Sequence, residues 1–84
     1  MKYTVIWTRL AEGQLAAIWV AASDRRAVTA AANKIDTLLS SDPDSQGESR
    51  PRGRRILLEA PLGVIFRVRH SDQTVFVLEV WRFN

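Results

Sequence analysis

Apolar residues recur with a helical period in two neighbouring stretches of the chain. The first stretch is expected to run from a capping Thr8 to about Ala22, and its apolar stripe consists of Ala11, Leu15, Ile18 and Ala22. The second follows Ser23 and Asp24 and ends at Asp42-Pro43, and its stripe consists of Val28, Ala31, Ala32, Ile35, Leu38 and Leu39. Because only one or two residues separate them, the two stretches predict an antiparallel helical hairpin.

Segments rich in β-branched and aromatic residues predict four strands, at residues 2–7, 55–59, 64–70 and 75–81. The order β-α-α-β-β-β indicates an α+β fold, a two-layer α/β sandwich with the helical hairpin packed on one face of a mainly antiparallel four-stranded sheet. The first strand is expected beside the fourth, since both carry apolar residues at both parities. Residues 42–53 lack apolar anchors and are expected to form a mobile loop.

The register of the three C-terminal strands follows from side-chain parity and loop length. Pro61-Leu62-Gly63, with Gly63 at a positive φ, and Ser71-Asp72-Gln73 both suit three-residue hairpin loops. This register predicts three cross-strand rows on the face that the helices leave open: Leu57, Arg67 and Val77; Arg55, Arg69 and Val75; and Glu59, Ile65 and Glu79. In that arrangement Arg55 and Arg69 face each other as like charges.

Size and composition limit the function. With 84 residues, 46% of them hydrophobic, the chain is expected to be one domain over residues 1–84 with a small core. It has no cysteine, which excludes disulfides and thiolate chemistry, and one histidine with scattered carboxylates predicts neither a metal site nor a cofactor. No segment approaches the roughly 18 apolar residues of a membrane span, so no membrane partner and a cytoplasmic location are expected.

The positive charge is the main functional signal. The net charge is +3, and the stretch GESRPRGRRILLE places Arg50, Arg52, Arg54 and Arg55 within six residues. Together with Arg67, Arg69 and Trp81, which the register puts on the open face, they form the candidate surface for an anionic partner. The alternative is an ordinary solvated sheet face, neutralised by nearby glutamates. Trp81 is expected either to contact a partner or to be covered by the chain itself, whereas Trp7 and Trp19 are expected in the core and His70 at the surface.

Three phrases of the sequence, KYTVIWTRLAEGQLAAIW, GRRILLEAPLGVIFRV and TVFVLEVWRF, occur in an order that resembles the RelE/ParE superfamily of type II toxins. The resemblance covers essentially the whole chain. It implies a growth-inhibiting toxin, of the kind associated with plasmid stabilisation, that a cognate antitoxin holds inactive. It also implies one of two targets: RelE-like members cut mRNA on the ribosome, and ParE-like members poison DNA gyrase.

The basic residues of the RelE-like nuclease are mostly missing at the matching positions. Arg55 matches the first basic position, but Leu57 stands at the next one, Leu62-Gly63 replaces the arginine that opens the third strand, and Arg82 is followed only by Phe83 and Asn84. The resemblance therefore favours the ParE-like activity, with Arg82 added to the candidate contact surface. The alternatives are an mRNA endonuclease that uses Arg55, Arg67 and Arg82, or a non-toxic binding module. Catalytic residues and homodimer formation stay open.

Overall fold

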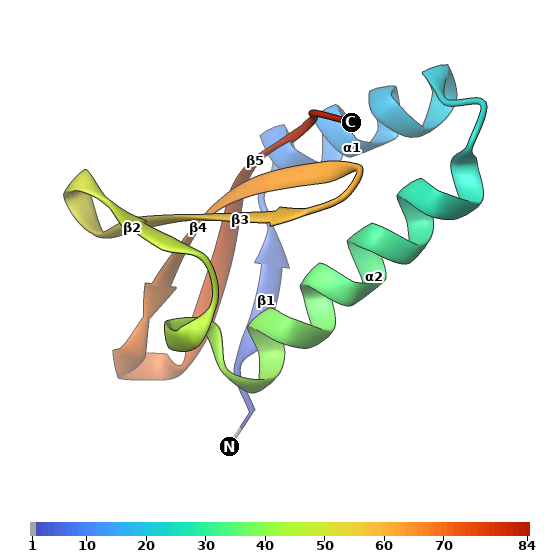
Figure 1. Ribbon diagram of the computed structural model, residues 1–84. Helices are drawn as coiled ribbons and strands as arrows, with labels where there is room; N and C mark the ends of the chain where they lie inside the picture. Colours follow the sequence, from blue (N-terminus) through green and yellow to red (C-terminus); the bar gives the residue numbers. More distant parts are fainter. Residues whose placement is uncertain (1) are drawn as a thin grey trace.

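The computed structural model describes residues 2–84 and contains two helices packed on one sheet (Figure 1). The helices are α1 (Arg9–Ala21) and α2 (Arg25–Ser41), and the strands are β1 (Thr4–Trp7), β2 (Glu48–Arg50), β3 (Arg54–Glu59), β4 (Leu62–Arg69) and β5 (Thr74–Arg82). Single 3₁₀ turns lie at Pro43–Ser45, Pro51–Gly53 and His70–Asp72. The predicted α+β architecture with a helical hairpin on the sheet is confirmed.

The sheet has five strands in the order β1-β5-β4-β3-β2, one more than predicted. β1 lies beside β5, as predicted, and runs parallel to it, and the other neighbours are antiparallel. The additional strand, β2, arises in the segment that was expected to be an irregular loop. β2 and β3 form a hairpin arm that projects away from the helices (Figure 1). Pro43, in the same segment, is fully buried.

Both helices form where their stripes predict, and α1 also has its predicted cap. The Thr8 hydroxyl accepts a hydrogen bond from the Ala11 amide at 3.3 Å, which satisfies one free donor of the first turn of α1. On α2, Val28, Ala31, Ile35 and Leu39 are buried and form the helical side of the core. This stripe packs against Leu57, Leu62, Val64, Phe66, Val75, Val77 and Val80 of the sheet. The core therefore lies between the helix pair and one sheet face.

The predicted register between β3 and β4 is wrong. The connection is the two-residue loop Ala60-Pro61, so Glu59 pairs with Leu62, Leu57 with Val64, and Arg55 with Phe66. An even loop shifts the pairing by an odd number of residues and turns β3 over relative to the prediction. Leu57 is consequently buried under the helices, Arg55 does not face Arg69, and Gly63 is not at a positive φ.

The predicted register between β4 and β5 is also partly wrong, because a β-bulge interrupts the pairing. Ile65 pairs with Glu79 as predicted, but the next residue of β4, Phe66, pairs with Val77, which leaves Leu78 as the extra residue of β5. The bulge reverses the parity of β5 at this point. Val75 and Val77 therefore face the helices together with Val80, and the predicted open-face positions of Val75 and Val77 are wrong. Of the three predicted rows, only the Ile65–Glu79 contact is present.

Candidate functional site

The open face of the sheet carries a row of arginines on three neighbouring strands. Arg50 of β2 lies directly opposite Arg54 of β3, and Arg54 lies directly opposite Arg67 of β4. All three side chains are exposed, and they point away from the helices because Leu57 and Phe66, at the opposite parity, are buried. We call Arg50, Arg54 and Arg67 the arginine row. Like charges thus do face each other across strands, but they are not the pair that parity predicted.

Arg69 continues the positive surface next to the row but has an internal partner. Its guanidinium donates two hydrogen bonds to the Asp72 carboxylate, at 2.9 and 2.6 Å, and lies 4.9 Å from the centre of the Phe76 ring. This ion pair lowers the pKa of Asp72 and raises that of Arg69, mainly through the side-chain hydrogen bonds. Arg69 therefore contributes less free charge than the arginines of the row.

Arg55 anchors the loop that leads into β2. Its guanidinium donates to the Gln46 carbonyl at 2.9 Å, to the Gly47 carbonyl at 3.2 Å and to the Ser49 hydroxyl at 2.8 Å. These bonds connect β3 with the start of the hairpin arm, so Arg55 holds the arm in position. Sequence reasoning grouped Arg55 with the contact arginines, but the structure places it on the helix-side face of β3, apart from Arg67 and Arg69.

Arg82 connects the end of β5 with the junction between the two helices. It donates to both carboxylate oxygens of Asp24, at 2.8 and 2.7 Å, and to the Asn84 carbonyl at 2.9 Å. The hydrogen bond from Arg82 is the main cause that lowers the pKa of Asp24. Asp24 is the residue before α2, but its carboxylate makes no capping bond and serves this ion pair instead. Arg82 lies at the far end of the sheet from the arginine row.

Trp81 lies on the open face, as predicted, and covers Gly63. Gly63 is directly opposite Trp81, and a Cβ atom at Gly63 would lie 2.6 Å from Cζ2 of the indole and 2.9 Å from Cδ2 of Leu58. The tryptophan ring therefore occupies the space that a side chain at Gly63 would need. Trp81 itself is half-buried, while the neighbouring Leu58 is 57% exposed.

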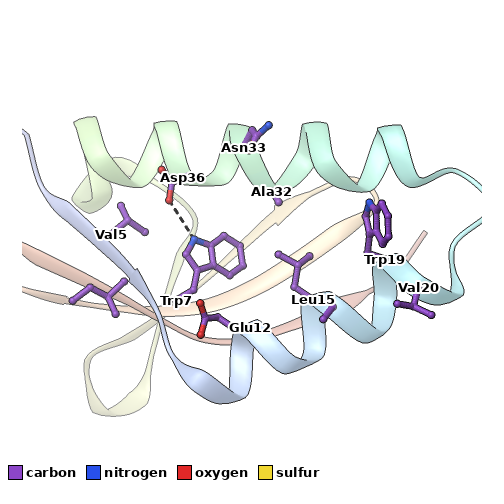
Figure 2. Close-up of a pocket in the computed structure, with 11 residues that line it drawn as sticks. Val5, Trp7, Glu12, Leu15, Trp19, Val20, Ala32, Asn33 and Asp36 are labelled. Atoms are coloured by element: carbon purple, nitrogen blue, oxygen red, sulfur yellow. Dashed lines mark hydrogen bonds between the residues drawn. The ribbon is translucent and has the colours of Figure 1, made fainter.

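A groove of about 760 Å³ lies between α1, α2 and β1, on the side of the molecule where no strand covers the edge of β1 (Figure 2). Figure 2 shows Leu15 between the rings of Trp7 and Trp19, with Glu12 and Asp36 along the two helices. Trp7 donates to Asp36 at 3.2 Å and packs partly against the core. The prediction of a core position for Trp19 is wrong, because this side chain is 43% exposed and lines the groove.

The groove was not predicted, although the sequence carries a signal for it. Ile6 and Val20, which line the groove, are apolar residues outside the predicted helical stripes, and they are 43% and 65% exposed. Apolar side chains that fit no stripe are the pattern expected of a surface that is covered only by a partner. Within residues 2–84, no group of three or more histidine and acidic residues could hold a metal ion, and neither helix is long and apolar enough to cross a membrane.

Comparison with known proteins places this geometry in a fold family. No protein-family model and no curated protein sequence matches the chain. Among solved structures, a chain of the toxin–antitoxin complex RelBE2 from Mycobacterium tuberculosis superposes with a TM-score of 0.81 at 22% identity, covering 98% of this chain and 92% of that one. A chain of the chromosomal ParDE system from P. aeruginosa gives 0.76 at 26% identity, covering 99% and 98%. The protein has the RelE/ParE toxin fold.

In this RelE/ParE fold, the corner formed by the end of β3, the start of β4 and the end of β5 contains no free cation among the described residues. Glu59 pairs with Leu62 and Leu62 with Arg82, so these positions lie side by side. Glu59 forms an ion pair with Lys34 of α2 at 3.4 Å, and Arg82 forms one with Asp24. The Trp81 ring fills the space over Gly63. Arg55, Arg67 and Arg82 lie on different faces or ends of the sheet and form no cluster.

Proposed function

We propose that this protein is the toxin component of a type II toxin–antitoxin module that acts in the cytoplasm. The observation that carries the proposal is the fold match along nearly the whole chain, to one structure described as a toxin–antitoxin complex and to another described as a ParDE system. Two exposed surfaces of opposite character, the apolar groove and the arginine row, support it further. They would allow one protein to bind an antitoxin and a target at separate places.

Within this proposal, the ParE-like activity, poisoning of DNA gyrase, is favoured over mRNA cleavage. An RNA-cleaving site needs several free cations around the scissile phosphate to orient it and to stabilise its developing charge. The corner where the RelE-like residues would lie instead holds an apolar ring over Gly63, and its one arginine, Arg82, is ion-paired with Asp24. The mRNA endonuclease stays the second candidate, because the fold is shared by RelBE2 and ParDE chains and does not by itself separate the two activities.

The experiment that separates the two activities uses induced expression and the purified protein. We expect a DNA-damage response and filamentation while translation continues, and accumulation of cleaved plasmid in a reaction with purified gyrase. Arrest of translation with codon-positioned mRNA cuts would support the endonuclease instead. An absence of any effect on growth would identify a non-toxic binding module of the same fold.

The apolar groove is the proposed docking site of the antitoxin. It combines an uncovered strand edge at β1 with exposed apolar side chains from α1, and an extended or helical segment of a partner could use both. Val20, the most exposed apolar side chain of the groove, offers a test. Val20→Lys should abolish binding of the protein encoded by the adjacent reading frame, measured by calorimetry, without loss of toxicity. Leu58→Lys, at a similarly exposed position on the opposite face, should leave that binding unchanged, and equal loss in both variants would contradict the assignment.

A further inference from the structure

The arginine row is a linear array of charge fixed on a rigid sheet. Arg50, Arg54 and Arg67 lie directly opposite one another on adjacent strands. Since neighbouring strands are about 4.8 Å apart, the row extends over about 10 Å of the open face. Its positions are set by the backbone ladder rather than by a loop, so the three guanidinium groups emerge from the sheet side by side.

Most of this charge has no internal counter-ion. Arg50 contacts Glu48 at 3.2 Å, but within residues 2–84 no hydrogen bond, ion pair or ring contact involves the guanidinium groups of Arg52, Arg54 and Arg67. Arg55, Arg69 and Arg82, in contrast, are all held by partners in the protein. Like charges placed directly opposite on neighbouring strands destabilise a sheet by a few tenths of a kcal/mol, and a bound anion would remove that repulsion.

The tip of the hairpin arm adds a fourth cation in an unfavourable backbone conformation. Arg52 has φ 67° and ψ 30°, in the left-handed region, which costs a residue other than glycine about 1 kcal/mol or more. A hollow of about 350 Å³ lies beside it, lined by Arg50, Pro51, Arg52, Arg54, Ile56 and Ile65. The arm thus holds Arg52 next to the row, around a shallow depression with an apolar floor.

We propose that the arginine row and Arg52 bind the phosphodiester backbone of a nucleic acid. This assignment rests on the proposed toxin function: for a gyrase poison the nucleic acid is the DNA on which gyrase acts, and for the second candidate it is mRNA. Arginine suits phosphate because its planar guanidinium can donate two parallel hydrogen bonds to two phosphate oxygens. The three strand positions of the row follow one another at about 4.8 Å, which suits the repeating charge of a phosphodiester backbone better than a single carboxylate of a protein partner.

The same geometry predicts little preference for base sequence. Phe76, the aromatic residue directly opposite Arg67, has the Arg69 guanidinium over its ring, so that ring face is not available for stacking on a base. Contacts to phosphates fix the position of a nucleic acid but carry no sequence information. DNA and RNA share the phosphodiester group, and the experiment therefore includes both.

The test is direct binding, measured by fluorescence anisotropy with a labelled 20-base-pair DNA duplex and a labelled 20-nucleotide single-stranded RNA. Contact with about three phosphates gives a slope of about −2.7 for log K against log salt on a duplex, which is about 40-fold weaker binding at 200 than at 50 mM salt. Arg54→Gln combined with Arg67→Gln should reduce the magnitude of that slope by about two. It should also weaken binding at least 10-fold at the lower salt concentration. Circular dichroism checks that the variant is folded.

The matched control is Arg9→Gln combined with Arg26→Gln, which removes the same net charge from exposed helical positions that also have no partner among residues 2–84. This variant should bind like the wild type. Equal weakening in both double variants, or no binding by the wild type at 50 mM salt, would overturn the inference, as would tighter binding to polyglutamate than to either nucleic acid. A toxic protein that binds no nucleic acid would remove this inference alone, whereas a non-toxic protein that binds would remove the toxin function alone.

Discussion

Replacing Gly63 by alanine tests whether the Trp81 ring fills the position at which the RelE-like resemblance places an arginine. The added Cβ would lie 2.6 and 2.7 Å from two indole carbons and 2.9 Å from Cδ2 of Leu58. The exposed end of Leu58 can move aside, but the rigid indole must shift as a whole. Overpacking of this kind costs about 1–3 kcal/mol, and the better strand propensity of alanine offsets about 0.5–1 kcal/mol of it. We expect a net loss of about 1 kcal/mol in the free energy of unfolding.

A double-mutant cycle isolates the contribution of the ring. In a Trp81→Ala background the space is open, so Gly63→Ala should stabilise the protein by about 0.5–1 kcal/mol. The expected coupling free energy between the two positions is therefore about 1–3 kcal/mol. Equilibrium urea unfolding should be followed by far-ultraviolet circular dichroism, because one substitution removes a fluorophore. The same shift can be followed as about 4–8 °C in the melting temperature per kcal/mol.

The refuting result is additivity. If Gly63→Ala changes the free energy of unfolding equally in both backgrounds, within about 0.5 kcal/mol, the ring does not occupy this space and the corner is open to a cationic side chain. Gly13→Ala is the control. A Cβ at Gly13 meets no atom within 4 Å, so this helical substitution should stabilise both backgrounds alike, by about 1 kcal/mol.

Three further predictions follow from the paired and unpaired arginines. Arg55→Gln removes the anchor of the loop before β2, so the amides of that loop should exchange with deuterium faster than in the wild type; unchanged protection would contradict the anchoring role. Asp24 has a pKa below its ordinary value of 3.8 because Arg82 hydrogen-bonds to its carboxylate, so this stabilisation is present above pH 3.8 and is lost as the pH falls through the lowered value. The stability difference between the wild type and Asp24→Asn should therefore shrink on acidification, and a difference independent of pH would exclude the ion pair as its source. Arg54→Gln relieves repulsion with Arg67 and should stabilise the fold by a few tenths of a kcal/mol in urea unfolding; a destabilised variant would show that Arg54 has a structural role.

The helical half of the fold was predictable because its signals are local. A cap at Thr8, a break at Asp42-Pro43 and the stripe of α2 all lie within a few residues of the elements that they define. The buried residues of α2 consequently match the predicted stripe, with Ala32 and Leu38 at its partly buried margin. The place of β1 beside β5 was predicted from its apolar residues at both parities, but β1 is an edge strand, and its exposed Ile6 lines the groove instead of lying inside the sheet.

The strand register was not predictable to the same degree, because it depends on loop length and on one bulge. Pro61-Leu62-Gly63 fits a three-residue loop in sequence, but the chain uses Ala60-Pro61 and continues directly into β4. An error of one residue in parity exchanges the two faces of a whole strand. The bulge at Leu78 gives no distinct signal either, since apolar residues occupy both parities around it.

The groove between the helices and β1 shows another limit of pattern reasoning. A helical stripe identifies the residues that face the protein's own core, but it gives no position to apolar residues outside the stripe. Trp19 fits both interpretations from the sequence, because it lies beside the stripe of α1. In the structure its indole nitrogen donates to Thr29 at 3.2 Å and the Arg25 guanidinium lies 4.6 Å from its ring centre, contacts typical of a surface residue.

The register error moved the candidate surface but did not remove it, and the reason lies in how the arginines alternate. Arg54 and Arg55 are consecutive, so one of them lies on the open face at either parity of β3. In the structure this is Arg54, which lies opposite Arg67 of β4. The other member of the pair then points to the helix-side face, where it can bond only to nearby backbone and side chains. Parity therefore decides which arginine anchors the arm and which stays free for a partner. Because the helices cover the face of Leu57 and Phe66, Arg55 is the anchor and Arg54 is the proposed contact residue.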